Sequence, residues 1–569
     1  MANGFGSLYV GQSGLQNAQY ALNTTANNLA NVDTKGYVRQ QVRFADKSYN
    51  KLKNPFNNVN MQQYGLGVSI GDVVHARDIF LDKSYRQESG RQGFYSSCYE
   101  ITDYVSDLFQ ELHGEQFKQS ITDLHTAFQE LAVNMDNSTQ QNLVFEKAEL
   151  LLSRTQSLYK DMTSYQSNIN EQIKDDVDRV NEIGQKVYEL NLEIQKVEAG
   201  GQETAMTLRD QRDSLLDELG TYGSVDIKED ATGFTYVDFE GARFVDMHRC
   251  YEIGMKQDRA TGFYTPYWPH LSDEDKNQYV NVYNPDEVIS TDLNTDVGSI
   301  KAKLLARGDR NGTYLDMETS EAYDKIAGCT MMETEAQLSL LLHNIVTKVN
   351  DVFCPNITCD KDVTYTDADG NTVSLNGKKI LDAEHAAVGA DGKLPPRELF
   401  TRSGVDRYTE VTGSDGETYY VYNEENADDP FSLYSLTNVD VNEELRKQIT
   451  LMPSKMTNGT DYPMGDKMQE IWNDKGMTLN PYDNKACTFE EFYDKMIGQM
   501  GTDGNVYKSA SETLTGAVES IDNQRQQTMG VSSDEELTNM IKFQSAYNAS
   551  SRFMTVISQM TELIVTGLV

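Results

Sequence analysis

The two ends of the chain carry apolar residues at helical spacing. Near the first end a leucine recurs every seven residues: Leu8, Leu15, Leu22 and Leu29. Three positions further on lie smaller residues: Gly11, Ala18, Thr25 and Val32. Near the other end the same spacing returns with Phe543, Ser550, Ile557 and Ile564, and with Ala546, Phe553 and Met560 between them. A seven-residue repeat predicts helices that pack along a seam, and alternating large and small residues let helices approach closely.

Local signals predict where these helices begin and end. Ser533 is followed three residues later by Glu536, the pattern of a capping box, so we expect a helix to begin there. Gly36 follows the first helix, as a C-terminal cap does. Asparagines share or border one face of that helix: Asn27, Asn28 and Asn31. Buried amides need partners and therefore tend to fix register, whereas the alternative is ordinary surface amides near a helix end.

Between the ends, the period of the apolar residues changes several times. Residues 38–90 are expected to be extended with short strands, and residues 94–220 mostly helical. Within the latter, apolar residues stepping by three and four over 169–197 predict a long coiled-coil face. Aromatic and polar residues alternate over 223–297, which is typical of strands. The chain then returns to helix over 300–350, to strand and turn over 360–435, and to a mixture over 440–525.

These patterns predict an α+β multidomain fold in which the N- and C-terminal helices pair in a coiled coil. The remaining units are a core domain rich in helices and inserted β-rich domains. The expected division is as follows: residues 1–35 plus 530–569 form a terminal polymerisation domain, 36–222 plus 298–356 plus 440–529 the mainly helical core, and 223–297 and 357–439 the two inserted β-rich domains.

Charge separates the ends from the rest. The whole chain has a formal net charge of −38, from 50 basic and 88 acidic residues. Residues 1–34 contain one charge, Asp33, and residues 537–569 contain Lys542, Arg552 and Glu562. Because like charges repel, uncharged ends can be packed in many copies while the acidic remainder faces solvent. A helical hairpin inside a monomer is the alternative interpretation of the two ends.

Composition argues against several classes of protein. Strong acidity argues against binding to nucleic acid. No apolar run approaches a membrane span, and the first basic residue is Lys35, so we expect neither a membrane span nor a cleaved signal peptide. The six cysteines do not form a disulfide scaffold; Cys354 and Cys359 could close a small loop, but two free buried thiols are favoured.

No pattern of a catalytic or cofactor site is present. The seven histidines are scattered, and the sequence contains no HExxH, GxSxG or phosphate-binding loop. Residues 367–371 resemble the start of a calcium loop, but its twelfth position is Lys378 instead of glutamate, so a hairpin turn is favoured. We therefore expect no catalytic residues, no cofactor and no metal. Adhesion through aromatic residues of the first inserted domain, around Tyr264, Tyr267 and Trp268, is a further alternative, although such residues are more often core.

Several blocks carry a resemblance to a known family. Residues 26–40 closely resemble the signature of flagellar rod, hook and hook-associated proteins, and residues 67–70 and 77–86 agree with it. Residues 208–219 resemble a segment of the hook-associated members, as do residues 530–536 and the following helix. The blocks stand in the family's order and cover roughly the first 220 and the last 90 residues. The middle of the chain is similar only in patches.

The resemblance implies a structural protein, without enzyme activity, at the junction of hook and filament. It implies termini that fold on assembly, export through the flagellar channel to an extracellular position, and a helical or ring homo-oligomer. Implied partners are the hook protein, the next hook-associated protein and an export chaperone at the C-terminal helix. A hook or distal-rod component is the alternative within the family. The seam then predicts these subunit-interface residues: Leu8, Leu15, Leu22, Asn27, Asn28, Leu29, Asn31, Phe543, Tyr547, Phe553, Ile557, Met560 and Ile564.

Overall fold

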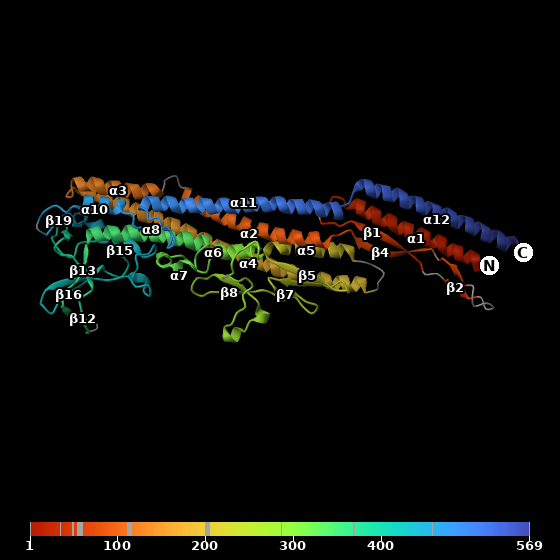
Figure 1. Ribbon diagram of the computed structural model, residues 1–569, viewed down its shortest axis with the longest axis horizontal. Coiled ribbons are helices and arrows are strands. Elements are labelled where there is room, and N and C mark those ends of the chain that lie inside the picture. Colours follow the sequence, from red (N-terminus) through yellow and green to blue (C-terminus); the bar gives the residue numbers. More distant parts are fainter. Residues whose placement is uncertain are drawn as a thin grey trace.

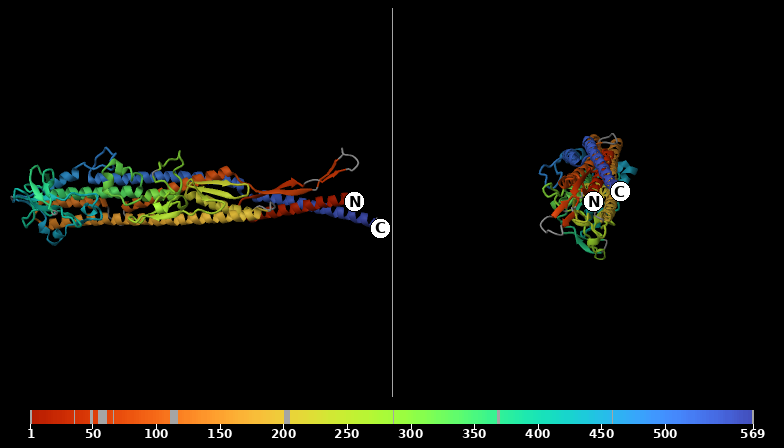
Figure 2. Two further views of the ribbon diagram at one scale, coloured as in Figure 1. Left: turned by 90° about the horizontal axis from the view of Figure 1, so that it is seen from below. Right: turned by 90° about the vertical axis from the view of Figure 1, so that its right-hand side faces the viewer.

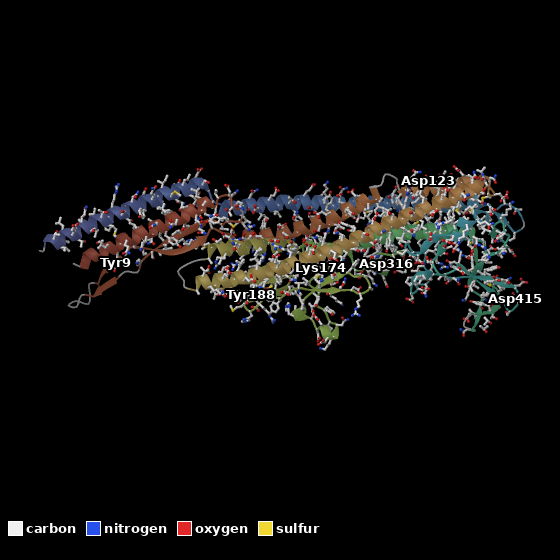
Figure 3. The ribbon with its side chains drawn as sticks, turned by 180° about the vertical axis from the view of Figure 1, so that it is seen from behind. Tyr9, Asp123, Lys174, Tyr188, Asp316 and Asp415 are labelled. Atoms are coloured by element: carbon white, nitrogen blue, oxygen red, sulfur yellow. The ribbon has the colours of Figure 1, made fainter. Side chains whose placement is uncertain are left out.

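The computed structural model describes residues 2–567, apart from residues 35, 48–49, 54–60, 66, 111–116, 200–204, 286, 368–369 and 458. The molecule is a long rod with both termini at one end (Figures 1 and 2). Asp415, in a turn at the opposite end, marks the far tip, whereas Tyr9 lies near the free end of the first helix (Figure 3). We call the end with the termini proximal and the other end distal.

Helices run along the rod and make up most of its length (Figure 1). The long helices are α1 (Ala2–Ala30), α2 (Ile79–Gln110), α4 (Ser138–Glu198), α8 (Thr330–Phe353), α11 (Phe489–Met529) and α12 (Ser533–Gly567). The shorter helices are α3 (Phe117–Val133), α5 (Met206–Tyr222), α6 (Ser299–Arg307), α7 (Ser320–Tyr323), α9 (Glu443–Lys447) and α10 (Met464–Asn473).

We call the part of the rod that α2 to α11 make up the body. Helix α4 is its longest helix. Asn137 caps its start by accepting a hydrogen bond from the Thr139 backbone N–H at 3.0 Å. Seven residues of the predicted apolar face are buried: Ile169, Ile173, Val177, Val180, Ile183, Val187 and Ile194. The face ends earlier than predicted, because Leu190 is half-buried and Val197 is 41% exposed. A spacing of three and four residues thus located the core-facing side of this helix correctly.

The strands form small antiparallel sheets attached to the helices. Proximal strands are β1 (Gln40–Asp46), β2 (Asn50–Lys53), β3 (Met61–Tyr64) and β4 (Val68–His75); β1 pairs with β4, and β2 with β3. Strands of the middle region are β5 (Val225–Glu229), β6 (Thr235–Phe239), β7 (Ala242–Val245), β8 (Gly254–Gln257) and β9 (Tyr264–Tyr267), in the orders β5-β6-β7 and β8-β9.

Distal strands surround the end of α8. They are β10 (Asn356–Thr358), β11 (Thr364–Thr366), β12 (Thr372–Ser374), β13 (Lys379–Leu381), β14 (Ala387–Val388), β15 (Phe400–Arg402), β16 (Tyr408–Thr412), β17 (Thr418–Tyr422), β18 (Val439–Val441) and β19 (Lys455–Met456). The largest sheet has the order β10-β13-β17-β16, and β11 and β12 form a hairpin. The predicted turn at 367–371 lies in that hairpin, where the Asn371 N–H donates to the Asp367 carboxylate at 2.7 Å; residues 368–369 lie outside the described residues.

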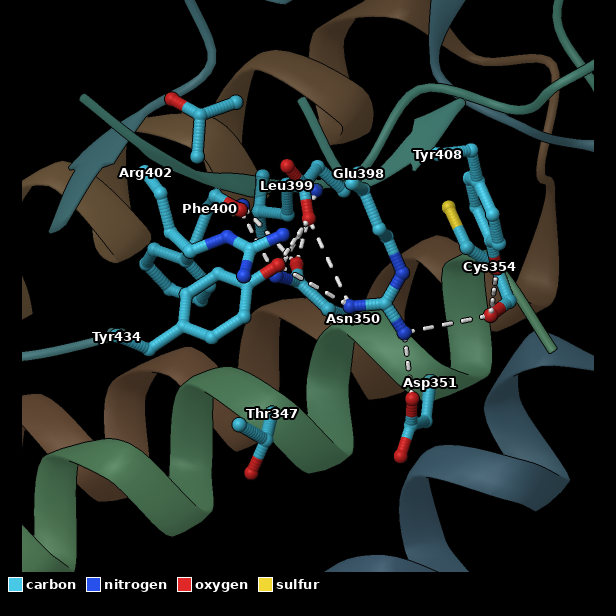
Figure 4. Close-up of polar contacts among 12 residues, drawn as sticks. Thr347, Asn350, Asp351, Cys354, Glu398, Leu399, Phe400, Arg402, Tyr408 and Tyr434 are labelled. Carbon is cyan, nitrogen blue, oxygen red and sulfur yellow. Dashed lines mark hydrogen bonds and ion pairs between the residues drawn. The ribbon is translucent and has the colours of Figure 1, made fainter. Parts of the chain in front are cut away.

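A buried polar cluster joins this distal region to α8 (Figure 4). The Asn350 side chain donates to the Phe400 carbonyl at 2.8 Å and accepts from the Phe400 N–H at 3.0 Å. Glu398 accepts from Asn350 at 3.1 Å and from the Tyr434 hydroxyl at 2.8 Å, and burial raises the pKa of its carboxyl. Buried polar groups of this kind demand partners, so the cluster fixes β15 in one register against α8.

Other predictions met mixed outcomes. All six cysteines are free, and Cys354 and Cys359 are buried, as favoured. Trp268 is only 1% exposed and belongs to the core, which argues against an aromatic adhesive surface there. The extended segment was predicted to reach residue 90, which is wrong, because α2 already begins at Ile79. The single helix predicted over 300–350 is divided into three, α6, α7 and α8. The proposed division into domains stays a prediction.

Because Glu335 on α8 is buried, the stability of the fold is expected to depend on pH. Its carboxylate accepts from the Gly312 N–H at 2.7 Å, and burial raises its pKa to about 8. Between the ordinary glutamate pKa and about pH 8, the folded chain therefore binds the proton more tightly than the unfolded chain, so stability falls as pH rises through this window.

We expect Glu335→Gln to flatten this dependence and to raise the free energy of unfolding at pH 8 by about 2–4 kcal/mol. Thermal melting at pH 5 and pH 8 measures it, with exposed Glu321→Gln as the control. Equal pH dependence in wild type and Glu335→Gln would refute this assignment.

Candidate assembly interface

The terminal helices α1 and α12 lie side by side beyond the proximal end of the body (Figures 1 and 2). Their backbones approach closely because glycines face the contact. A Cβ added to Gly11 would lie 2.8 Å from Met554 Cγ, and one added to Gly14 would lie 2.8 Å from Ser550 Oγ. The predicted pairing of the termini and the close approach through small residues are therefore present within one chain.

The structure places the predicted leucines differently from the small residues. The buried residues of α1 are short: Gly11, Ser13, Ala18, Ala21, Thr24, Thr25 and Asn28. Helix α12 lies against Gly11, whereas Gly67 beside β4 lies against Ser13, and Gln40 of β1 binds Asn28. The leucines at 8, 15, 22 and 29 are each half-buried, so they keep apolar surface in contact with solvent.

Helix α12 exposes even more apolar surface. Phe543, Tyr547 and Ile557 are half-buried, and the Phe543 ring packs edge-on against Phe44 of β1 with 6.0 Å between the ring centroids. Large apolar side chains are exposed along its length: Leu537, Ile541, Phe553, Val556, Met560, Leu563, Ile564 and Val565. Among them, predicted interface residues Phe553, Met560 and Ile564 are 42%, 58% and 53% exposed. An apolar face of this length on a charge-poor helix is typical of a surface that another polypeptide covers.

Of the three predicted asparagines, Asn28 has the register-fixing position. It is 1% exposed, and its side chain binds both backbone groups of Gln40, donating to the carbonyl at 2.9 Å and accepting from the N–H at 3.1 Å. It also accepts from the Tyr37 hydroxyl at 2.9 Å and donates to Glu536 at 3.1 Å. Asn27 and Asn31 bond chiefly to each other near the surface and have no such role in the described contacts.

Salt bridges of Arg39 with Glu535 and Glu536 hold the start of α12 against the segment that follows α1; we call these three residues the clasp. Arg39 pairs with Glu535 at 2.7 Å and with Glu536 at 2.8 Å, and its N–H donates to the Met529 carbonyl at 2.9 Å. The predicted start of the helix at Ser533 is confirmed. The role of Glu536 differs from a capping box, because its carboxylate binds Asn28 and Arg39, which are 508 and 497 positions away in the chain.

A buried ion-pair cluster lies where the terminal pair meets the body; we call this region the neck. Arg525 of α11 pairs with Asp82 of α2 at 2.9 Å and with Asp217 of α5 at 2.6 Å. Arg86 adds a second contact to Asp217 at 2.7 Å, and Arg77 pairs with Asp82 at 2.6 Å and with Asp213. The cluster thus ties three helices together, because Asp82 and Asp217 each pair with Arg525 and with a second arginine.

The neck was not predicted from the sequence. Residues 208–219 stood out only as a family block, yet Asp213 and Asp217 of that block hold the arginines of the neck. Asp210 of the same helix accepts from the Val38 N–H at 3.2 Å, and burial raises the pKa of its carboxyl to about 7. A row of aspartates spaced three and four residues apart, at 210, 213 and 217, was the available signal, since that spacing puts them on one side of a helix.

A groove opens beside the neck, between the end of α1, α4 and α5. Its volume is about 740 Å³. Apolar side chains in its lining include Tyr37, Leu190 and Leu215, and α4 contributes charged residues such as Glu189 and Glu193.

Within the described ranges, no group of three or more His, Cys, Asp or Glu side chains is arranged to hold a metal ion. None of the described helices is sufficiently long and apolar to cross a lipid bilayer.

Three protein families match separate parts of this chain. The family described as "Flagellar hook-associated protein FlgK helical domain" matches residues 102–363. "Flagella basal body rod protein" matches residues 8–37, and "Flagellar basal body rod FlgEFG protein C-terminal" matches residues 521–566. The two rod-type matches therefore cover most of α1 and nearly all of α12, together with the end of α11.

Similar proteins span the whole chain. Flagellar hook-associated protein 1 of Bacillus subtilis (strain 168) is 24% identical, covering 100% of this chain and 99% of its own length. The protein of that name from Salmonella typhimurium is 24% identical, covering 95% of this chain and 96% of itself. A solved structure, the flagellar hook junction protein FlgK from Burkholderia pseudomallei, covers 79% of this chain and 99% of its own at 14% identity and a TM-score of 0.47.

Proposed function

We propose, because the chain belongs to the family of flagellar rod, hook and hook-associated proteins, that it forms the junction between hook and filament by folding its termini on assembly. Its role in the flagellum is a structural, hook-associated one. The observation that carries the proposal is the apolar surface of α1 and α12. These helices project beyond the body, and one chain leaves this surface exposed.

Assembly-coupled folding follows from the energetics of this pair. Isolated helices of about 30 residues are marginal in water without packing partners. Docking against neighbours would bury the half-buried leucines of α1 and the exposed apolar side chains of α12, and this burial offsets the entropy lost on ordering. Contacts between different faces of successive copies generate open helical tubes or closed rings instead of two-fold dimers. The interface residues predicted from the sequence are part of this proposal.

The remaining assignments belong to the same proposal. The chain would reach an extracellular position through flagellar export, contact the hook protein on one side and the next hook-associated protein on the other, and meet an export chaperone at α12. It would have no enzyme activity. The acidic body and its β-rich regions would face solvent, which keeps a dense array soluble.

Hydrogen exchange on the purified monomer tests assembly-coupled folding. We expect fast exchange over residues 1–35 and 533–569, because one partner helix covers them incompletely, and slow exchange within 94–220. Assembled flagella should protect both ends. Slow exchange at both ends of the monomer would contradict the proposal.

Electron microscopy of cells that lack the protein tests the junction itself. We expect hooks without filaments, with filament protein released into the medium. Filaments of normal length on such cells would refute a junction role.

A further inference from the structure

Two large apolar side chains stand exposed at the neck, on the first turn of α2. Ile79 is 83% exposed and Phe80 is 75% exposed, although the next turn of the same helix is anchored by buried Asp82. The exposure is a consequence of how this turn is held. Asp78 accepts from the Phe80 N–H at 2.9 Å, and the ion pairs of Asp82 and Arg86 turn the opposite side of α2 toward the body.

The neck groove lies at the same level of the rod, on other elements. Ile79 and Phe80 are absent from its lining, which comes from α1, α4 and α5 and the turn before β1. Its volume of about 740 Å³ falls within the range of roughly 300–1,000 Å³ that encloses drug-sized ligands, so two side chains fit into it. Tyr37, Leu190 and Leu215 supply an apolar lining for them.

Carboxylates outnumber cations in the groove lining: Glu189, Glu193 and Asp210 line it together with Lys186, whose ammonium pairs with Glu182 at 2.7 Å. Lys83 is exposed one turn after Ile79. Glu189 and Glu193, one turn apart on α4, are exposed and line the groove. A cation beside the apolar pair and two carboxylates beside the groove favour a contact between two copies of this chain, because opposite charges steer matching surfaces into register.

We propose that Ile79 and Phe80 of one subunit insert into the neck groove of a neighbouring subunit, with Lys83 beside Glu189 and Glu193. The contact rests on the proposed function, since it requires subunits side by side in an assembly. It joins two different faces of the neck and is therefore heterologous, which propagates around a ring or tube. The terminal helices then hold the subunits along the axis, and the necks fix their lateral spacing.

Cross-linking tests the contact directly. A chain carrying Phe80→Cys and Ser214→Cys, the latter an exposed groove residue, is expressed in cells whose own copy is deleted. Isolated flagella are treated with a short thiol-specific cross-linker. We expect covalent dimers and higher multimers in denaturing gels, and none with either single variant. Wild type is a control, because five native cysteines are buried and burial raises the pKa of the sixth, Cys250, to about 12.

A double variant, Ile79→Ala with Phe80→Ala, tests the energetic role. Because both side chains are exposed, we expect the monomer to keep its melting temperature while incorporation into flagella falls at least tenfold. Val133→Ala removes an 85% exposed apolar side chain at the end of α3 and should have no effect. Normal incorporation of the double variant, or flagella that contain the cysteine pair but yield no multimers, would overturn the contact.

Charge reversal gives an independent outcome. Lys83→Glu should reduce incorporation, and adding Glu193→Lys should restore it; failure of that restoration would count against the pairing. Failure of the neck contact is distinguishable from failure of the proposed function. If Ile557→Asp blocks assembly while the neck variants assemble normally, the junction role stands and the neck contact falls. If Ile557→Asp also assembles normally, the proposed function itself falls.

Discussion

Replacing Ile557 by aspartate is expected to abolish attachment of the filament and reduce motility to background. Ile557 lies half-buried on α12, in a segment of 33 residues (537–569) that contains only three charges. In an assembled seam its side chain would be enclosed, and burying an unpaired carboxylate costs several kcal/mol in every subunit. Because every subunit carries the same substitution, the free-energy cost is added once for each subunit of the assembly.

The body should remain folded in this variant, because α2 to α11 do not depend on the outer turns of α12 for their core. Swimming assays and electron microscopy give the primary readout, and melting of the purified monomer should change by less than about 2 °C. Ile557→Leu conserves volume and should behave as wild type. Leu22→Asp places the same charge among the half-buried leucines of α1 and should match Ile557→Asp. Normal motility of either aspartate variant would contradict the seam.

Replacing Arg525 by methionine is expected to destabilise the body by about 1.5–3 kcal/mol, the range for losing hydrogen bonds to charged groups, because Asp82 and Asp217 keep Arg77 and Arg86 as partners. Its side chain is 6% exposed and contacts Asp82 and Asp217, which are 7% and 19% exposed. The substitution leaves both aspartates at the neck without this partner. It should therefore loosen α11 from α2 and α5 as well as lower global stability.

Denaturant unfolding of the purified chain measures this loss. Arg446→Met is the matched control, because Arg446 and Glu149 form an exposed ion pair, for which about 0–1 kcal/mol is expected. The loss of unfolding free energy for Arg525→Lys should lie between those for Arg525→Met and Arg446→Met, since an ammonium group cannot reproduce the planar double contact. Equal midpoints for Arg525→Met and Arg446→Met would show that the neck cluster does not stabilise the fold.

The sequence by itself determined those features that depend on neighbouring residues. Apolar spacing located the buried side of α4 and the stripe of α8 made by Leu338, Leu341, Ile345 and Val349, all of which are buried. The same spacing identified both terminal helices, and the predicted start of α12 at Ser533 is correct. These successes share a cause, because the period of a helix is a local property that a run of residues reveals without its partners.

The first turn of α2 shows where local patterns fail. Residues 79–90 were expected to be extended, yet they are helical and bring Asp82 and Arg86 to Asp217 and Arg525. Ile79 and Phe80 are apolar but exposed, so they fit no inward-facing stripe. Asp78 caps this helix by accepting from the Phe80 N–H at 2.9 Å, which is a local signal, whereas the ion pairs with distant helices that orient the turn leave no periodic trace.

Only the tertiary structure decided which apolar residues the two ends cover within one chain and which charges meet. The half-burial of the four leucines depends on how α12, β1 and β4 pack on α1. Glu536 meets Asn28 and Arg39 across 508 and 497 positions of the chain, and three aspartates of α5 meet partners from separate segments. Contacts between remote segments arise from the packing of the whole chain, and therefore spacing along the sequence predicts helices but not the neck that joins them.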